Sequence, residues 1–415
     1  MPAISVVIPV YNAAPFLREA LDSLLAQTCG DFEAIAVNDG STDNSLEILQ
    51  EYAARDSRIR ILDGPNGGYG KAMNRGMDAA TGKYMAILEP DDYLPREAYA
   101  ILLEKAEKHQ LDVVRGAHCS FFEQEGHREY MYRTPQYELG RVFRPLDDIP
   151  GVFQCGPGIW CNIYGLSFLR QYGIRFHESP GASYQDTGFF LLCAVYAERY
   201  MLIPDAVYMY RMDNPASSVK SVDGKRDALL KEYEYIKACL KKNPDIWPLS
   251  SLPFYWCFMC GQRWVYRQLS EAIRPGFVET LRTYVAGCLN DGAMLPETEW
   301  LMQSIAHGND EVLQEFTSDH GDEKQKNIVK KIMGFSWYSV SMSAERTVRR
   351  LFGVPILERR RVAAWQQLAP WLVVANGYKN RYFLFGVPLG ERWSVPCGKL
   401  VDAELVPAIV NPALM

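Results

Sequence analysis

The sequence predicts an α/β protein whose central sheet is mostly parallel and doubly wound. From residue 4 to residue 92, apolar and β-branched runs alternate with segments of helical spacing, the pattern of repeated strand–helix units. Each apolar run ends in a polar, turn-forming cluster. After residue 220 the apolar spacing becomes mostly helical, so we expect a helical module and then a small C-terminal region to follow the sheet.

The first two strands carry the clearest signals. Ile4 to Val10 is a continuous apolar run that stops at Tyr11-Asn12. Phe32 to Val37 ends in the cluster Asn38 to Asp43, whose glycine and Ser, Thr and Asp residues suit a turn and a helix start. We expect two more strands over 59–62 and 84–88, and helices over 16–25, 46–49 and 72–80. Strict alternation implies parallel pairing with right-handed connections.

The fourth strand delivers three carboxylates to the edge of the sheet. Met85-Ala86-Ile87-Leu88 is too short for a helix of its own, and Pro90 prevents helical continuation. The side chains of Glu89, Asp91 and Asp92 repel one another unless a cation lies among them. One or two carboxylates, with phosphates and water, commonly hold Mg²⁺ or Mn²⁺, so Glu89 and Asp91 are candidate metal ligands. The alternative is a solvated turn in which Asp92 caps the next helix.

Four polar clusters are expected at this edge, because the carboxyl ends of parallel strands lie together. They are Pro9 to Asn12, Asn38 to Asp43, Gly64 to Lys71 and Glu89 to Asp92. Ligands of such sheets bind beyond the carboxyl ends of the strands. Any one cluster could be an ordinary turn, but four at one edge indicate a site.

The glycine-rich segment narrows the choice of ligand. Met73 occupies the last glycine position of a dinucleotide-binding motif, and Pro65 occupies the first glycine position of a P-loop. A dinucleotide oxidoreductase and a P-loop NTPase are therefore disfavoured. The remaining interpretation is a nucleotide that stacks on Tyr11, is hydrogen-bonded by Asp39, and extends its diphosphate toward a metal at Asp91.

Four segments resemble the inverting family 2 glycosyltransferases with the GT-A fold, a Rossmann-like nucleotide-sugar domain. They are Ser5 to Asn12, Val37 to Asp43, Asn66 to Gly76 and Glu89 to Asp92. Their order and spacing match that family across residues 4–92. The resemblance implies that Pro9, Tyr11 and Asp39 hold the base and ribose of a nucleotide sugar, with UDP as the expected nucleotide. It also implies that Asp91 binds the metal.

Two positions depart from the family pattern. Glu89 replaces the first Asp of the usual D-x-D, which lengthens that arm by one carbon. Met73 stands where many relatives carry an Arg, and Lys71 is a candidate for supplying that charge, with a solvated lysine at a helix start as its alternative. The candidate donor-binding residues are Pro9, Tyr11, Asn12, Asp39, Asn66, Lys71, Glu89 and Asp91, and the candidate ligands of Mn²⁺ or Mg²⁺ are Asp91 and Glu89.

The acceptor side is expected after the metal strand. The segment around Trp160 resembles the part of the family that lines the acceptor, so Trp160 is a candidate sugar platform, with core packing as the alternative. Ser183 to Phe190 resembles the segment in which relatives carry Glu-Asp; Gln185 replaces the Glu and Asp186 keeps the Asp. The candidate acceptor-binding residues are Asp92, Trp160 and Gln185.

The chemistry of an inverting transfer requires a general base. An acceptor hydroxyl with a pKa far above 7 must lose its proton as it attacks the anomeric carbon, and one positioned carboxylate suffices. Asp186 is the candidate catalytic residue, and a helix N-cap is its alternative role. Tyr210 and Arg211 could touch phosphate or brace the segment that carries the base, and the sequence leaves this choice open.

Composition limits the partners and the compartment. The chain has 415 residues, 48% of them hydrophobic, and a net charge of −6, with no long basic run in the first three hundred residues. We therefore expect no nucleic-acid partner. The chain opens with a strand pattern rather than a leader, and no long apolar stretch is present, so a cytoplasmic protein is expected.

Domain boundaries follow the changes in pattern. We expect a catalytic domain over 1–220, with a nucleotide-binding part over 1–115 and an acceptor part over 116–220, then a helical module over 221–335 and a C-terminal region over 336–415. The C-terminal region contains Leu-Phe-Gly-Val-Pro twice, starting at Leu351 and Leu384, which we interpret as paired β arms or turns.

The first repeat lies in a basic, tryptophan-containing stretch. Its members are Arg346, Arg349, Arg350, Arg359, Arg360, Arg361, Trp365 and Trp371. Such a cluster can dock on anionic lipid, which would place the protein peripherally at the inner membrane face; a solvated basic face is the alternative.

The resemblance implies a metal-dependent inverting glycosyltransferase. It would move a sugar from a nucleotide donor, with UDP expected, to a glycan or lipid-linked acceptor in cell-surface polysaccharide synthesis. A nucleotide-sugar-binding module with weak or no turnover is the alternative, because Gln185 and Glu89 depart from the pattern. A glycoside hydrolase with a carboxylate pair is a third class, and it would cleave glycans without metal.

Overall fold

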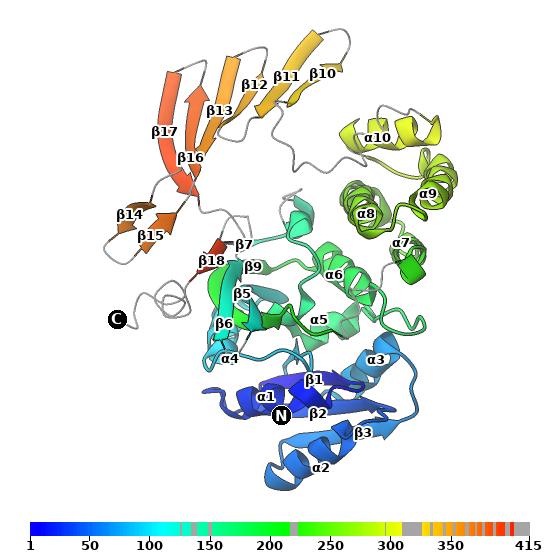
Figure 1. Ribbon diagram of the computed structural model, residues 1–415, viewed down its shortest axis with the longest axis vertical. Helices are drawn as coiled ribbons and strands as arrows, with labels where there is room; N and C mark the ends of the chain where they lie inside the picture. The colour runs from blue at the N-terminus through cyan, green and yellow to red at the C-terminus, as the bar shows by residue number, and fades with distance from the viewer. Residues whose placement is uncertain are drawn as a thin grey trace. The chain divides into compact units, whose positions relative to one another are not determined.

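The chain divides into two compact units, residues 1–317 and 318–415 (Figure 1). In this computed structural model the described residues are 1–124, 127–133, 139–147, 152–215, 223–294 and 296–308, together with strands between 326 and 401. Each unit is described by itself below.

The first half of unit 1 has the predicted alternation of strands and helices. Its elements are β1 (Ile4–Val10), α1 (Ala14–Leu25), β2 (Phe32–Asp39), α2 (Ser45–Arg55), β3 (Ile59–Gly64), α3 (Tyr69–Ala79) and β4 (Tyr84–Ile87). β1 pairs in parallel with β2 and with β4, and β2 pairs in parallel with β3. In this register Val7 lies opposite Ile35 on one side and Ile87 on the other. The predicted parallel α/β sheet is therefore confirmed.

The second half of unit 1 adds strands of both directions to the sheet. Its elements are α4 (Ala98–His109), β5 (Val113–Gln124), β6 (His127–Arg133), β7 (Val142–Phe143), β8 (Asn162–Gly165), α5 (Leu166–Gln171), α6 (Gln185–Tyr196) and β9 (Tyr200–Arg211). The strand order is β6-β5-β8-β4-β1-β2-β3, with β8 antiparallel to both β4 and β5, and β9 parallel to β5. The sheet is mixed at this end and parallel around β1.

The sheet is buried on both faces. Alternate residues of β1 belong to two separate apolar clusters: Val7 faces one, and Val6 and Ile8 face the other. Helices α1, α2 and α4 contribute side chains to the cluster that contains Val6. Helices α3, α5 and α6 contribute to the cluster that contains Val7. Burial on both faces explains why the strands are nearly continuous apolar runs.

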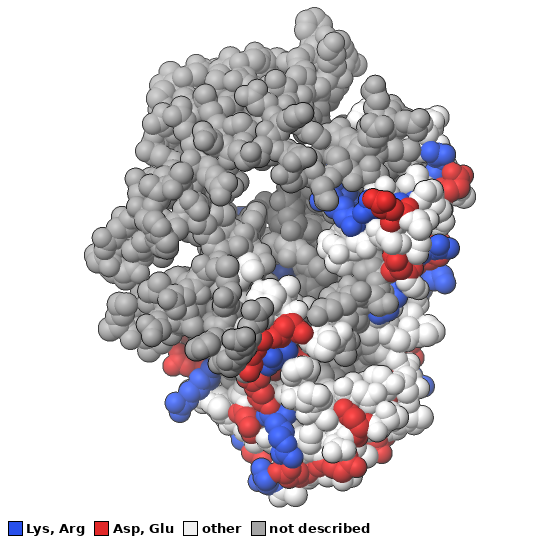
Figure 2. All heavy atoms as spheres, viewed as in Figure 1, with Lys and Arg blue, Asp and Glu red and all other residues white. Residues whose placement is uncertain are grey.

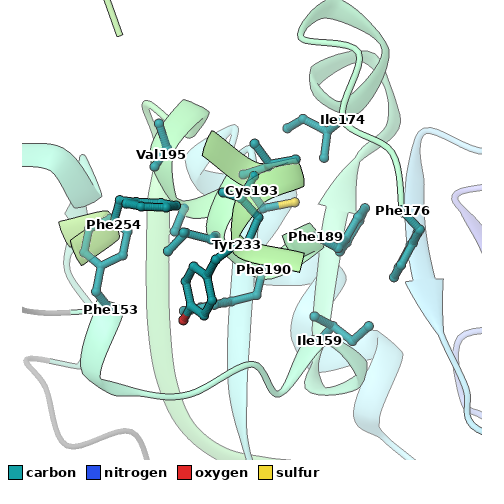
Figure 3. Packing of buried hydrophobic residues seen from close by; sticks show 14 of the residues in the cluster. Phe153, Ile159, Ile174, Phe176, Phe189, Phe190, Cys193, Val195, Tyr233 and Phe254 are labelled. Atoms are coloured by element: carbon teal, nitrogen blue, oxygen red, sulfur yellow. The ribbon is translucent and has the colours of Figure 1, made fainter. Parts of the chain in front are cut away.

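The helical module contributes side chains to the cluster that contains Val7. Its helices are α7 (Ala228–Lys241), α8 (Trp247–Gln268), α9 (Arg274–Cys288) and α10 (Pro296–Ala306). Tyr233 of α7 and Phe254 of α8 belong to the same buried cluster as Phe189 and Phe190 of α6, as Figure 3 shows. Phe189 also stacks on Phe176 with ring centroids 4.2 Å apart. The helices therefore pack directly on the layer that covers the sheet.

Unit 2 consists of antiparallel strands. Its main sheet has the order β10 (Lys326–Ile332), β11 (Phe335–Met342), β12 (Arg346–Leu351), β13 (Val354–Arg361), β16 (Tyr378–Leu384) and β17 (Val387–Ser394), and β14 (Trp365–Ala369) pairs with β15 (Leu372–Ala375). β10 lies within residues 221–335, which the apolar spacing assigned to a helical module. The prediction that the helical module continues to residue 335 is therefore wrong.

The two repeats lie at equivalent hairpin turns. Leu351 pairs with Val354 and Leu384 pairs with Val387, so each Leu-Phe-Gly-Val-Pro copy spans the end of one strand and the start of the next. The strand register shifts between Arg349 and Arg350 in the first hairpin, and at the matching place in the second. The side chains of the predicted arginine and tryptophan membrane surface lie outside the described residues.

Two surface observations bear on partners. Within the part of the chain that the structure describes, no helix has the length and hydropathy needed to cross a bilayer. On the face shown in Figure 2, Lys and Arg side chains are interspersed with Asp and Glu over the described residues. This mixture gives no support to a nucleic-acid interface on that face.

Replacing Gly76 by alanine tests the packing of α3 on the sheet. A Cβ at Gly76 would overlap Val7 Cγ1 and lie 3.3 Å from Val37 Cγ2, both in stiff, buried side chains. We expect Gly76→Ala to destabilise the protein by about 1–3 kcal/mol through overpacking. The matched control is Gly276→Ala in α9, where a Cβ meets open space and alanine favours the helix by up to about 1 kcal/mol. Urea unfolding compares the two, and equal midpoints would contradict the proposed packing.

Candidate active site

Asp39 joins the end of β2 to the glycine-rich loop, residues 64–70. Its Oδ1 and Oδ2 accept hydrogen bonds from the backbone N–H groups of Gly67 and Gly68 at 2.8 and 2.9 Å. The next residue, Gly40, has φ 71°, and a Cβ there would lie 2.6 Å from Asn66 N. Only glycine fits this close, left-handed position without strain. The Asp39 carboxylate thus sets the shape of the loop expected to face the donor.

The other predicted donor residues lie at the same strand ends. Tyr11 is 53% exposed just after β1, so its ring is available for stacking. Asn12 has φ 49°, and its Oδ1 accepts from Thr42 N at 2.7 Å, which ties the β1 turn to the β2 turn. Pro9 is buried within β1, and Asn66 and Lys71 are exposed at the glycine-rich loop. Their contacts with a donor stay predictions.

Glu89 is held between two tyrosines. Its Oε1 accepts a hydrogen bond from the Tyr69 hydroxyl at 2.7 Å, and its backbone N–H donates to the Tyr208 hydroxyl oxygen at 3.0 Å. Burial raises the pKa of Glu89 to about 8, and the negative charges of Asp91 and Asp186 add to this rise. The three carboxylates therefore share one electrostatic environment, although Asp186 is distant in sequence.

Asp91 and Asp92 differ in their surroundings. Asn214 donates to Asp91 Oδ2 at 2.7 Å. Asp92 is 2% exposed, its Oδ1 accepts from Arg211 N at 2.7 Å, and burial raises its pKa well above the ordinary value. Asp92 therefore anchors the end of β9. It does not cap α4, whose N-cap position is Glu97, and its geometry gives no support to an acceptor contact.

Arg211 braces the carboxylate segment. Its guanidinium lies over the rings of Phe16 and Phe121, at 4.7 and 4.6 Å, and pairs with Glu19 Oε2 at 2.6 Å. Its Nε donates to the carbonyl oxygen of Asp91 at 3.0 Å. Arg211 is only 6% exposed. The sequence left open whether Arg211 touches phosphate or braces the segment that carries the base. Its contacts favour a bracing role, but the segment that it braces carries Asp91.

Asp186 lies in the first turn of α6. Its Oδ1 accepts from the N–H of Thr187 at 2.8 Å. Burial raises the pKa of Asp186 to about 6, although hydrogen bonds from the helix start oppose this rise. The N-cap residue of α6 is Tyr184, so the alternative role of Asp186 as the N-cap is wrong. A partly buried carboxylate with this pKa is ionised at neutral pH and is more basic than an ordinary aspartate.

The segment before α6, residues 179–184, is named the base loop here. Gln185 is 2% exposed and uses its amide within this loop: Oε1 accepts from Ser183 N, and Nε2 donates to Ser179 Oγ at 2.8 Å and Gly181 O at 3.2 Å. The predicted acceptor contact of Gln185 therefore has no support in the geometry. The N–H of Tyr69 also donates to Gly181 O at 3.0 Å, which joins the glycine-rich loop to the base loop.

Trp160 belongs to an aromatic cluster. It stacks on Tyr208 and Tyr210 with centroids 4.5 and 5.0 Å apart, and His118 approaches at 4.7 Å in an edge-on arrangement. The hydroxyl oxygen of Tyr208 also accepts the hydrogen bond from the backbone N–H of Glu89. These contacts support the packing interpretation of Trp160, and its role as a sugar platform stays a prediction.

Glu232 is a buried acid that the sequence reasoning missed. It is 1% exposed in α7, and Oε2 lies 2.8 Å from His177 Nδ1. Its Oε1 packs against Gly188, two residues after Asp186, where a Cβ would overlap it. Burial raises the pKa of Glu232 to about 8, and the Asp186 charge adds to this. The available signal was the helical spacing that places Glu232, but not Glu234, on the same face as Leu229 and Ile236.

The carboxylate edge fits a hard divalent cation that a ligand helps to hold. Glu89 and Asp91 offer oxygen donors, and their repulsion would fall on binding a cation. In the described ranges, no group of three or more His, Cys, Asp or Glu is arranged to hold a metal ion unaided. Two carboxylates completed by donor phosphates suit Mg²⁺ or Mn²⁺.

Sequence comparisons identify relatives of this chain. The family model described as Glycosyl transferase family 2 matches residues 5–172. The uncharacterized glycosyltransferase EpsJ of Bacillus subtilis is 36% identical over 222 residues, which are 52% of this chain and 63% of EpsJ. Glycosyltransferase GlyG of Streptococcus pneumoniae is 38% identical over 212 residues, 50% of this chain and 70% of GlyG. This chain thus covers less than two thirds of EpsJ.

Structural comparison supports the fold. S. aureus TarS 1-349 in complex with UDP-GlcNAc superposes with a TM-score of 0.60 at 17% identity, covering 82% of this chain and 97% of that chain. At this identity the likeness concerns the fold. The GT-A fold expected from the sequence motifs is confirmed.

The pKa of Glu232 predicts a specific pH dependence of stability. The folded state keeps the Glu232 proton up to about pH 8, whereas the unfolded chain loses it near 4.5, so stability falls as pH rises through this interval. Burial lowers the pKa of the facing His177, so this histidine does not favour the ionised form of Glu232 by becoming more readily protonated. Glu232→Gln cannot ionise, so its Tm should fall less than that of the wild type between pH 5 and pH 9. The control Glu234→Gln changes an exposed residue of the same helix, and its Tm should follow that of the wild type at each pH. If the Tm of Glu232→Gln falls with pH as steeply as that of the wild type, the raised pKa of Glu232 is contradicted.

Proposed function

This chain belongs to glycosyl transferase family 2, and we propose that it is an inverting glycosyltransferase that uses a UDP-sugar donor. The acceptor is a hydroxyl of a glycan or a lipid-linked saccharide in cell-surface polysaccharide synthesis, at the cytoplasmic face of the membrane. The TarS structure with UDP-GlcNAc supports the donor class. The fold places four loops at one sheet edge, as this chemistry needs.

The observation that carries the proposal is the shared environment of Glu89, Asp91 and Asp186. The charges of Asp91 and Asp186 both raise the pKa of Glu89, and Tyr69 is hydrogen-bonded to both Glu89 and Gly181, which supports one site between the segment after β4 and the first turn of α6. A diphosphate side and a base side must face the same anomeric carbon in an inverting transfer. In this chain we assign Glu89 and Asp91 to the diphosphate side and Asp186, about a hundred positions later, to the base side.

The donor side binds and orients the nucleotide sugar. The loop shaped by Asp39 presents backbone groups, and the exposed Tyr11 ring provides a stacking face. Asp91 and Glu89 are the proposed ligands of Mn²⁺ or Mg²⁺. When bound there, the ion offsets the charge that develops on the departing diphosphate.

Asp186 acts on the acceptor side as general base. It accepts the proton of the acceptor hydroxyl as that oxygen bonds to the anomeric carbon, and the bond from this carbon to the diphosphate oxygen breaks with its electron pair. Attack from the face opposite the nucleotide inverts the configuration. Because burial raises the pKa of Asp186 to about 6, the carboxylate is ionised at pH 7 and binds a proton more strongly than a solvated aspartate.

Replacing Asp186 by asparagine should separate donor binding from transfer. Asparagine keeps the shape but cannot take a proton, so we expect transfer to fall by about 10²–10⁴-fold. The donor is first chosen by a thermal-shift panel of UDP-, GDP-, CMP- and dTDP-sugars with MnCl₂, and Asp186→Asn should keep that shift. Asp245→Asn, an exposed carboxylate of the helical module, is the control. Unchanged turnover in Asp186→Asn would refute the base assignment.

The pH dependence of transfer should report the same carboxylate. Below about pH 6 Asp186 is protonated and cannot act as a base, so kcat/KM should rise with pH and level off above this value. One unit below the pKa, the rate should be about tenfold below the plateau. Initial rates at saturating MnCl₂ measure the profile, with thermal shifts checking that the donor still binds at pH 5. A flat profile from pH 5 to pH 8 would contradict the role.

A further inference from the structure

The helical module reaches the base loop at two points. Lys225, at the start of this module, donates from Nζ to the carbonyl oxygen of Ala182 at 2.6 Å. Trp264 of α8 meets Tyr184 in an edge-on contact, with ring centroids 6.2 Å apart and an interplanar angle of 83°. Both contacts fall on the segment that leads directly into Asp186. The module therefore borders the site as well as packing on the core.

Tyr184 has an unusual backbone conformation. Its φ is 65°, a left-handed conformation that is unfavourable for a residue with a side chain. Burial raises the pKa of the Tyr184 hydroxyl, and the negative charge of Asp186 adds to the rise, so the phenol and the carboxylate lie in one environment. Strain of this kind persists where the surroundings hold it, and it concentrates at functional sites.

Trp264 exposes a large apolar surface beside this strained residue. Its side chain is 42% exposed, although its neighbours Val265 and Tyr266 are buried. An indole open to water next to a catalytic loop has an apolar face and a polar N–H edge. By contrast, Trp160 has a ring face covered by Tyr208 and Tyr210. Of these two tryptophans, Trp264 is the one with an exposed ring, and it contacts Tyr184 of the base loop.

We propose that Trp264 and Tyr184 form the aromatic wall of an acceptor subsite that binds a pyranosyl unit. One face of many pyranoses presents C–H groups while hydroxyls surround the rim, so this face packs on an indole and leaves the hydroxyls free. The subsite rests on the proposed function, because Asp186 at the end of the base loop needs a hydroxyl to deprotonate. The Lys225 contact with Ala182 holds the loop that carries Tyr184, so the helical module takes part in acceptor recognition.

Saccharide binding by tryptophan variants tests the subsite. The full chain, labelled with a fluorophore, is applied with UDP and MnCl₂ to immobilised mono- to tetrasaccharides, and Kd is then measured for the saccharide that binds best. Trp264→Ala should weaken binding about tenfold, the loss expected when an aromatic stacking contact of roughly 1.4 kcal/mol is removed. Trp264→Phe keeps an aromatic face and should recover most of the affinity. Trp300→Ala removes a tryptophan that is 54% exposed on α10 and should leave Kd unchanged.

Donor binding is measured separately, so the two proposals can fail independently. If the nucleotide-sugar panel shifts the Tm of the wild type, the donor site exists whatever the saccharide result. The subsite is overturned if the wild type binds none of the saccharides, if Trp264→Ala binds as tightly as the wild type, or if Trp300→Ala loses as much affinity. Absence of any nucleotide-sugar shift would overturn the proposed function instead.

Discussion

Tyr69 holds the two sides of the candidate site together. Its hydroxyl binds Glu89 at the end of the carboxylate strand, and its backbone N–H binds Gly181 in the base loop. Gly68, next to it, accepts no larger residue, because a Cβ would lie 2.9 Å from Gly181 N. The first turn of α3 therefore links the segment that carries Glu89 to the loop that precedes Asp186.

The fold buries three acids around this junction. Burial raises the pKa values of Glu89, Asp186 and Glu232, and charge repulsion adds to the rise for Glu89 and Glu232, so ionising these acids costs more in the folded chain than in water. The buried Arg211 offsets part of the charge on the strand side, through contacts with the backbone of Asp91 and with Glu19.

The sequence predicted the parts of the fold that depend on local pattern. The first four strands lie within a residue or two of their predicted ends, and the carboxylates at Glu89 and Asp91 stand where the apolar run ends. It did not predict β8 between β4 and β5, since such pairing depends on partners distant in sequence. The Glu232 contact with His177 was missed for the same reason. Asp186 was found through the family resemblance, because one aspartate before an apolar helix carries little signal alone.

The apolar layer shared by α6 and the helical module sets the minimal autonomous folding unit. A chain cut near residue 220 would leave the α6 surface around Phe189 and Phe190 without the α7 and α8 side chains that cover it. Such a fragment would expose a large apolar patch to water, and we expect it to self-associate. The layer that covers the sheet, which contains α6, and the helices α7 and α8 therefore depend on one another for the burial of a single core.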